Sequence, residues 1–193
     1  MKERIEAAFR SYQSVMVQMP TGTGKTILLA EVVKSEERRV KNPCVWIVVH
    51  RRELVEQIKA SLNVECEMLN ATHNVKCEML NVKRGKPLDS SLFTFHSSLI
   101  KVFSIQLLSR HYQEMEEKPS LIIIDEAHHA VAKTYKEVMD AYPEAKKLGM
   151  TATPCRLNRR GFTDLFDVLL QSWSAKKFIA DGWLSLYDYM SIR

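Results

Sequence analysis

The sequence predicts an α/β fold, a three-layer sandwich in which helices cover both faces of a central, mostly parallel sheet. Short apolar runs alternate along the chain with longer amphipathic segments, and strands joined by crossover helices produce this alternation. Apolar runs such as Cys44–Val49 and Leu121–Ile124 are hydrophobic at successive positions. A strand with this pattern is buried on both faces, as it is when the sheet lies between two helical layers.

The amino-terminal half supplies the first part of this alternation. One predicted helix, Glu53–Leu62, is apolar at Leu54, Val55, Ile58 and Leu62, which is the spacing of one helix face. The elements expected in this half are helix Lys2–Arg10, strand Ser14–Gln18, helix Thr26–Glu37, strand Cys44–Val49 and helix Glu53–Leu62.

The segment Asn63–Ser98 does not follow the alternation. It contains an approximate duplication, Asn63–Asn70 against Asn74–Asn81, and we interpret it as an insert, because two copies do not make a repeat protein. Leu92–Phe95 and Leu99–Phe103 both have the composition of strands. We expect Leu99–Phe103 to join the central sheet.

The carboxyl-terminal half continues the pattern with short apolar runs and amphipathic segments. The elements expected after the insert are strand Leu99–Phe103, strand Leu121–Asp125, helix Lys133–Tyr142, strand Lys146–Met150 and helix Ser174–Ala180. Together the two halves predict a single domain over residues 1–193, with an insert at 63–98.

Composition and charge narrow the function classes. The chain is 46% hydrophobic and carries a formal net charge of +5, an excess that suits a polyanionic partner such as nucleic acid. The apolar runs are too short to cross a bilayer, and the charged start Met1–Arg4 does not predict a signal peptide. The four cysteines form no CxxC pair, which favours free thiols and a cytoplasmic location.

A glycine-rich turn between the first strand and the following helix is the strongest local signal. Its residues are Thr21, Gly22, Thr23, Gly24, Lys25 and Thr26. Glycines let backbone N–H groups converge on phosphates, and the helix N-terminus favours an anion. Lys25 would contact the β- and γ-phosphates, and the Thr26 hydroxyl would bind Mg²⁺. Met19 stands where the general pattern begins with glycine.

An acidic pair, Asp125 and Glu126, follows the apolar strand Leu121–Ile124. Open α/β sheets bind ligands at the carboxyl ends of their strands, so we expect this pair to face the glycine-rich turn. Asp125 is then the predicted Mg²⁺ partner. Glu126 is placed to orient or deprotonate an attacking water. Lys25, Asp125 and Glu126 are therefore the predicted catalytic residues.

These motifs resemble those of superfamily 2 helicases of the DEAD/DEAH-box type, and in particular the motor subunits of restriction enzymes. The matching segments are Met19–Thr26, His50–Leu54, Ser104–Arg110, Asp125–His128 and Thr151–Pro154. They occur in the family's order and cover about Ser14 to Asp167. The resemblance implies the first RecA-like domain of such a motor, a P-loop fold that uses ATP and Mg²⁺.

The resemblance also implies roles for residues outside the phosphate turn. His128 would couple the nucleotide site to Thr151 and Thr153, which would link the state of ATP to the hold on nucleic acid. The resemblance implies contacts with the backbone of a nucleic acid, with DNA favoured over RNA. The residues that would make these contacts are Arg51, Arg52, Ser104 and Gln106. Such contacts bind phosphate and sugar and do not distinguish sequences.

Two departures from the family pattern affect these expectations. The family has an adenine-reading Gln well upstream of the phosphate turn, whereas Gln13 lies too close to that turn. The family also places ATP between two RecA-like domains, and no second one follows within this sequence. Because an arginine finger from a second domain adds about 10³ to 10⁵ in rate, we expect weak hydrolysis without it.

Three other interpretations remain open. A restriction-type motor that translocates along duplex DNA without separating strands has the same first domain. A nucleotide-binding regulatory module needs no water-activating acid, so Glu126 disfavours it. A small-molecule kinase leaves Asp125–His128 and Thr151–Thr153 as coincidences.

Overall fold

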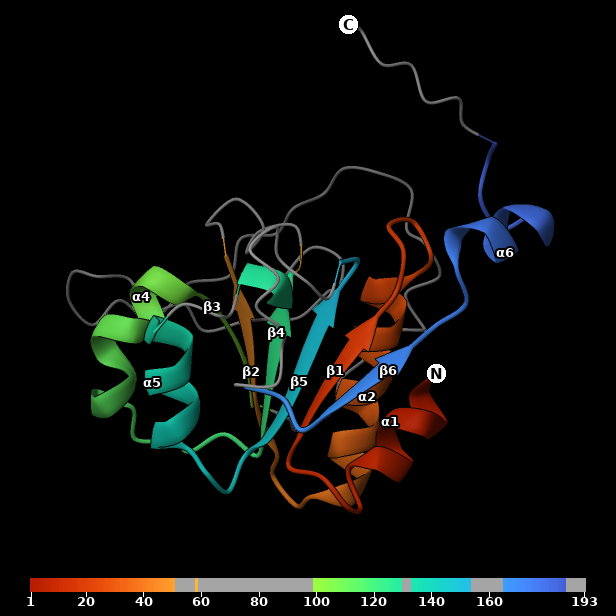
Figure 1. Ribbon diagram of the computed structural model, residues 1–193. Coiled ribbons are helices and arrows are strands. Elements are labelled where there is room, and N and C mark those ends of the chain that lie inside the picture. The colour runs from red at the N-terminus through yellow and green to blue at the C-terminus, as the bar shows by residue number, and fades with distance from the viewer. Residues whose placement is uncertain (51–57, 59–98, 130–132, 154–164, 187–193) are drawn as a thin grey trace, which may run out of the picture.

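Six parallel strands form the centre of the computed structural model, which describes residues 1–50, 58, 99–129, 133–153 and 165–186. They are β1 (Ser14–Gln18), β2 (Cys44–Val49), β3 (Leu99–Ser104), β4 (Leu121–Asp125), β5 (Lys146–Thr151) and β6 (Val168–Gln171). Their order across the sheet is β3-β2-β4-β5-β1-β6 (Figure 1). Neighbours in the sheet are therefore mostly distant in sequence, as crossover connections require.

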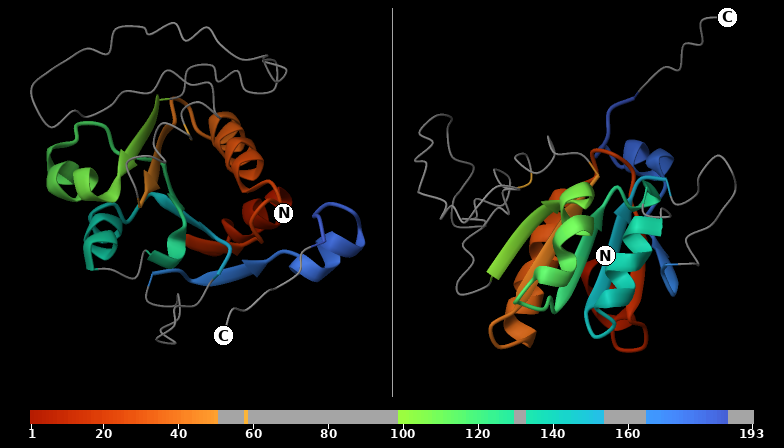
Figure 2. Two further views of the ribbon diagram at one scale, coloured as in Figure 1. Left: turned by 90° about the horizontal axis from the view of Figure 1, so that it is seen from above. Right: turned by 90° about the vertical axis from the view of Figure 1, so that its left-hand side faces the viewer.

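Helices lie on both faces of this sheet (Figures 1 and 2). The described helices are α1 (Lys2–Ala8), α2 (Lys25–Arg39), α4 (Ile105–His111), α5 (Lys133–Ala141) and α6 (Ala175–Ala180), with 3₁₀ turns η2 (Tyr112–Glu114) and η3 (Ala127–His129). Helices α1 and α2 cover one face, and α4 and α5 cover the other. The structure therefore confirms the predicted three-layer α/β sandwich.

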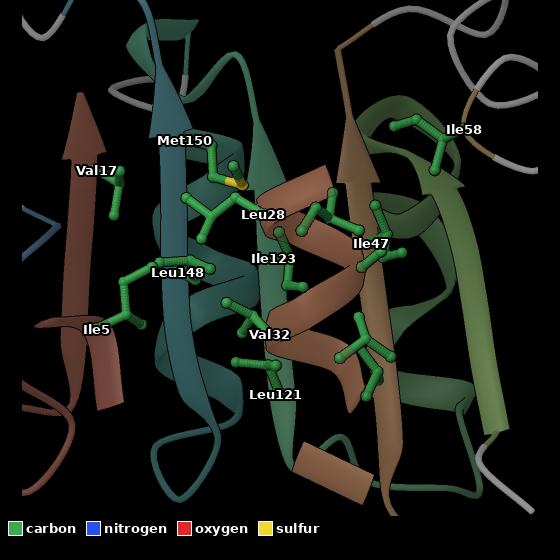
Figure 3. Close-up of a cluster of buried hydrophobic side chains, with 14 of the residues drawn as sticks. Ile5, Val17, Leu28, Val32, Ile47, Ile58, Leu121, Ile123, Leu148 and Met150 are labelled. Atoms are coloured by element: carbon green, nitrogen blue, oxygen red, sulfur yellow. The ribbon is translucent and has the colours of Figure 1, made fainter. Parts of the chain in front are cut away.

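Alternate residues of each strand enter different cores, because successive strand side chains point to opposite faces. In β4, Leu121 and Ile123 pack with α1 and α2, as Figure 3 shows from the side of these helices, with parts of the chain in front cut away. Ile122 and Ile124 of the same strand pack in the second core, beneath α4 and α5. The β4 side chains of both cores are almost completely buried, which is why this run is continuously apolar.

The predicted strands agree closely with the observed ones. Ser14–Gln18, Cys44–Val49 and Leu121–Asp125 have the expected bounds, and Leu99–Ser104 joins the sheet beside β2. The edge strand β6 was not expected. Most of the predicted helix Glu53–Leu62, and the insert 63–98, lie outside the described residues.

None of the helices in the described part of the chain is both long and apolar enough to cross a membrane.

Candidate active site

The sheet order brings three motifs to one edge. Strand β5 pairs with β1 on one side and with β4 on the other, in parallel register. Gln18 at the end of β1 lies opposite Thr151 of β5, and Asp125 at the end of β4 lies opposite Met150. The phosphate turn, the acidic pair and the Thr151 segment therefore all begin where neighbouring strands end. This is the ligand-binding edge of an open α/β sheet.

The phosphate turn has the backbone shape that its glycines predict. Gly22 and Gly24 have φ of 81° and 87°, in the left-handed region that side chains disfavour. The Thr23 hydroxyl donates to the Pro20 carbonyl at 2.7 Å and holds the turn closed. Helix α2 begins directly afterwards at Lys25, and no side chain of the described residues caps it. Its first N–H groups are thus available to a phosphate.

The turn is tied to the next strand through its own backbone. The Met19 N–H donates to the Thr151 carbonyl at 2.9 Å, so the first residue after β1 extends the pairing with β5. Met19 is also buried in the core under α2. A side chain at this position therefore anchors the turn, which accounts for methionine where the general pattern has glycine. Thr21 and Thr26 are exposed at either end of the turn.

Lys25 and Glu126 join the phosphate turn to the acidic pair. The Lys25 ammonium lies 3.5 Å from Glu126 Oε1, and the two side chains are 14% and 33% exposed. Lys25 and Glu126 are distant in sequence, so the fold brings their side chains together. The predicted phosphate-binding lysine and the predicted water-activating acid therefore lie together at one edge of the sheet.

Glu126 itself has an unusual backbone. Its φ of 50° lies in the left-handed region, which a residue with a side chain adopts at a cost of about 1–3 kcal/mol. Strand β4 ends one residue earlier and η3 begins one residue later. The left-handed turn thus places the carboxylate between Lys25 and His128, whose Nδ1 lies 3.3 Å from Glu126 Oε2.

Asp125 is poised for a cation. Burial raises the pKa of its carboxyl, and the neighbouring Glu126 carboxylate raises it further. A bound divalent cation would stabilise the ionised form of such a buried carboxyl. Magnesium prefers a few oxygen ligands and retains several waters, so the Asp125 carboxylate and the Thr26 hydroxyl are a suitable donor set.

His128 connects the acidic pair to β5. Its Nδ1 lies 3.0 Å from the Thr151 hydroxyl. That hydroxyl donates its proton to the Thr153 carbonyl at 2.9 Å and accepts from the Thr153 N–H at 3.1 Å. Because a hydroxyl has one proton to give, the contact with His128 requires the proton on Nδ1. The predicted coupling residues therefore form one continuous network with Glu126.

The predicted nucleic-acid contacts are only partly described. Ser104 is buried, and its hydroxyl accepts from the Leu107 N–H at 3.4 Å as the N-cap of α4. Gln106 is exposed and donates to the His50 carbonyl at 3.1 Å, bridging the ends of β2 and β3. It lies at the same sheet edge as the phosphate turn. Arg51 and Arg52 lie outside the described residues.

One contact with the turn was not foreseen from the sequence. The segment after α6 returns to the phosphate turn, where a Leu184 methyl lies 3.2 Å from the position that a Cβ on Gly22 would occupy. The only local signal was Gly182 just after an amphipathic helix, which is typical of a helix end. A cavity of about 440 Å³ lies elsewhere, at the opposite sheet edge between Phe9, Arg39 and Lys146.

Comparison with known proteins finds a matching family and several relatives. The family model described as "Type III restriction enzyme, res subunit" matches residues 1–156. A "51.5 kDa protein" of Lactococcus phage (isolate 7-9) is 32% identical over 177 residues, which are 92% of this chain and 32% of that protein. The chain spans about a third or less of the length of the curated relatives it matches.

Solved structures share the fold at low sequence identity. The type ISP restriction-modification enzyme LlaGI, solved with a DNA substrate mimic, has a TM-score of 0.65 at 17% identity, covering 94% of this chain and 20% of that one. The Hef helicase domain of Pyrococcus furiosus has a TM-score of 0.61 at 19% identity, covering 89% and 37%. The shared fold is that of RecA-like helicase domains.

Proposed function

Because the chain belongs to the family of type III restriction enzyme res subunits, we propose that it is the ATP-binding motor domain of a nucleic-acid-dependent ATPase. One observation carries the proposal. The Lys25 ammonium of the phosphate turn lies 3.5 Å from Glu126, the residue that directly follows β4. This pair is typical of a site that binds a triphosphate and also hydrolyses it.

The phosphate turn binds the nucleotide. Backbone N–H groups of Thr21–Gly24 and of the start of α2 surround the phosphates, and Lys25 neutralises their charge. A bound Mg²⁺ would supply positive charge that offsets the charge developing on the phosphates. Thr26 and Asp125 would hold that ion. On binding, the Lys25 ammonium exchanges its contact with Glu126 for the terminal phosphate, which releases Glu126 towards water.

Glu126 acts as the general base or water-orienting group. A positioned carboxylate of this kind contributes about 10²- to 10⁴-fold in rate. His128 holds Oε2 of this carboxylate and also contacts Thr151. A change at the phosphate therefore reaches Thr151 and Thr153 through one side chain, and we assign the coupling role to this network.

Nucleic acid is the proposed partner, with DNA favoured over RNA. The net charge of +5 suits a polyanion, and the similar LlaGI structure contains a DNA substrate mimic. A second RecA-like domain, in a longer chain or another protein, completes the nucleotide site in this proposal. Strand separation and translocation along duplex DNA are alternative outputs of the same domain. A regulatory module without turnover is the non-enzymatic alternative.

Two substitutions test the proposal in a chain that also carries the second domain. Lys25→Ala removes the phosphate-binding charge and should weaken binding of Mg-ATP on the order of 100-fold, measured by equilibrium dialysis. Glu126→Gln should leave binding within about twofold and lower phosphate release by about 10²- to 10⁴-fold.

Lys41→Ala is the matched control for Lys25. Lys41 is exposed in the connection between α2 and β2, at the opposite edge of the sheet. Its replacement removes the same charge and should alter neither binding nor hydrolysis. Equal turnover by the Glu126→Gln variant and the parent would overturn the assignment of Glu126 as the catalytic base.

A further inference from the structure

The sheet order gives a bound nucleotide a direction. In the proposed function, the terminal phosphate would face Lys25 and Glu126, and Glu126 directly follows β4. Strand β1 lies between β5 and β6, so the nucleoside end lies on the side away from β4. Figures 1 and 2 show β6 and α6 on that side. This step rests on the proposed function, because it assumes a triphosphate in the turn.

A capped helix end determines the path of the chain on that side. The Gly182 N–H donates to the Ile179 carbonyl at 3.0 Å, and the Trp183 N–H donates to the Phe178 carbonyl at 2.9 Å. Gly182 has a φ of 78°. These bonds and this left-handed glycine form a Schellman motif, which reverses the chain at the end of α6. The position of Trp183 is therefore set by backbone hydrogen bonds and does not depend on its side chain.

The reversed chain contacts the phosphate turn. Leu184 lies 3.2 Å from the Cβ position of Gly22, and Ile27 lies 3.8 Å from the Cβ position of Gly24. Each of the two left-handed glycines thus has an apolar neighbour. The neighbours come from different elements, the segment after α6 and the first turn of α2.

This apolar surface is open to solvent. Trp183 is 75% exposed and Ile27 is 62% exposed. Leu184 and Ile27 each lie beside a glycine of the phosphate turn, and Trp183 directly precedes Leu184 in the chain. Apolar side chains beside a polar ligand site are typical of pockets for the apolar part of that ligand. The purine base is the flat, apolar part of a nucleoside triphosphate, and an exposed aromatic ring stacks on it.

We propose that Ile27, Trp183 and Leu184 form the base-binding surface of the nucleotide site, with the indole of Trp183 stacked on the base. These side chains offer stacking and apolar contact, and the indole N–H is their sole hydrogen-bonding group. Stacking depends on ring area and tolerates different base edges. The surface therefore selects purine over pyrimidine and discriminates weakly between ATP and GTP.

Base binding is separated from phosphate binding by comparing nucleotides with inorganic tripolyphosphate. Dissociation constants are measured by calorimetry for Mg-ATP, Mg-GTP, Mg-CTP and Mg-tripolyphosphate. Trp183→Ala should weaken ATP and GTP by about tenfold, within the range of one lost stacking contact. It should leave tripolyphosphate within about twofold, and Trp183→Phe should restore most of the purine affinity.

Trp173→Ala is the matched control. Trp173 is 61% exposed, but its ring contacts Phe178 and the Lys177 ammonium at the start of α6. Its replacement should change none of the dissociation constants. In fluorescence, ATP should quench the Trp173→Phe variant and not the Trp183→Phe variant, while tripolyphosphate quenches neither.

The outcomes separate the base-binding surface from the proposed function. If Trp183→Ala leaves ATP unchanged, or weakens ATP and tripolyphosphate by the same factor, the base-binding surface is wrong and the phosphate site stands. If the parent protein binds neither ligand, the motor function itself is overturned, and this inference with it.

Discussion

At the scale of single residues, the two oxygens of the Glu126 carboxylate contact different partners. One oxygen lies 3.5 Å from the Lys25 ammonium, and the other lies 3.3 Å from His128 Nδ1. The backbone of Glu126 has a left-handed φ of 50°. The strand–turn–helix pattern predicts which acid this is, because strand ends and motif order are visible in sequence. The same pattern does not predict the left-handed backbone of Glu126, because this conformation arises where β4 ends beside β5.

Asp125 gives a prediction for stability and pH. Burial raises the pKa of its carboxyl, so in the absence of a cation the ionised form destabilises the folded protein. The stability contributed by the protonated form is present below the unfolded pKa, about 3.9, and is lost as pH rises through the higher folded pKa. Asp125→Asn should therefore raise Tm at pH 7 relative to the parent.

The pH dependence supplies the check on this prediction. The Tm difference between Asp125→Asn and the parent should be small near pH 4 and should grow as pH rises towards 7, measured by calorimetry without divalent cations. Added Mg-ATP should stabilise the parent and not the variant. A difference that shrinks with rising pH would contradict the raised pKa.

At the scale of elements, β5 contains a glycine that the packing requires. A Cβ on Gly149 would lie 2.5 Å from the Phe166 ring and 3.0 Å from the Ala127 Cβ. Phe166 is buried in the second core, so the ring has little room to move. Gly149→Ala should lower the free energy of unfolding by about 1–3 kcal/mol, as overpacked cores do.

A double-mutant cycle tests this account. Phe166→Leu removes the ring atoms that meet the new methyl group, so Gly149→Ala should cost less in the Phe166→Leu background than in the parent. Urea unfolding measures the interaction free energy, expected at about 0.5 kcal/mol or more. Additive effects of the two substitutions would place the cost elsewhere in the strand.

The elements that sequence predicts well share strong patterns. Strand β4 is apolar at successive positions because both of its faces are buried, and α2 follows a turn rich in glycine. Edge strand β6 (Val168–Gln171) was missed because its residues are only half-buried or exposed, which leaves a weak pattern. A hydroxyl before a helix is also the signal of an N-cap, and the Ser104 hydroxyl caps α4. The contact of Ser104 with nucleic acid stays a prediction.

At the scale of the whole molecule, one edge of the sheet carries every described residue of the proposed site. Gln106, beyond β3, lies on this same edge. The proposed nucleic-acid contacts and nucleotide contacts therefore share a rigid support, as a coupled motor requires. Sequence order alone does not show this proximity, because β2 and β4 separate β3 from β5 in the sheet.

Coupling across that support gives a prediction for the longer chain. Duplex DNA should stimulate phosphate release at least tenfold when the second domain is present, since an arginine from that domain is worth about 10³ to 10⁵ in rate. Stimulation should fall steeply between about 50 and 200 mM salt, because phosphate contacts release counterions. A steady-state ATPase assay measures both. A rate unchanged by DNA and RNA of every form would favour the regulatory alternative.

The position of Thr151 has a consequence for variation in this site. Its carbonyl holds the Met19 N–H, while its hydroxyl faces His128 and Thr153. The first attachment belongs to the peptide backbone and survives any ordinary side-chain replacement, whereas the second disappears with the hydroxyl. Replacement of Thr151 can therefore remove the contact with His128 without displacing the phosphate turn. The proposed coupling through His128 and the position of the phosphate turn can therefore change separately.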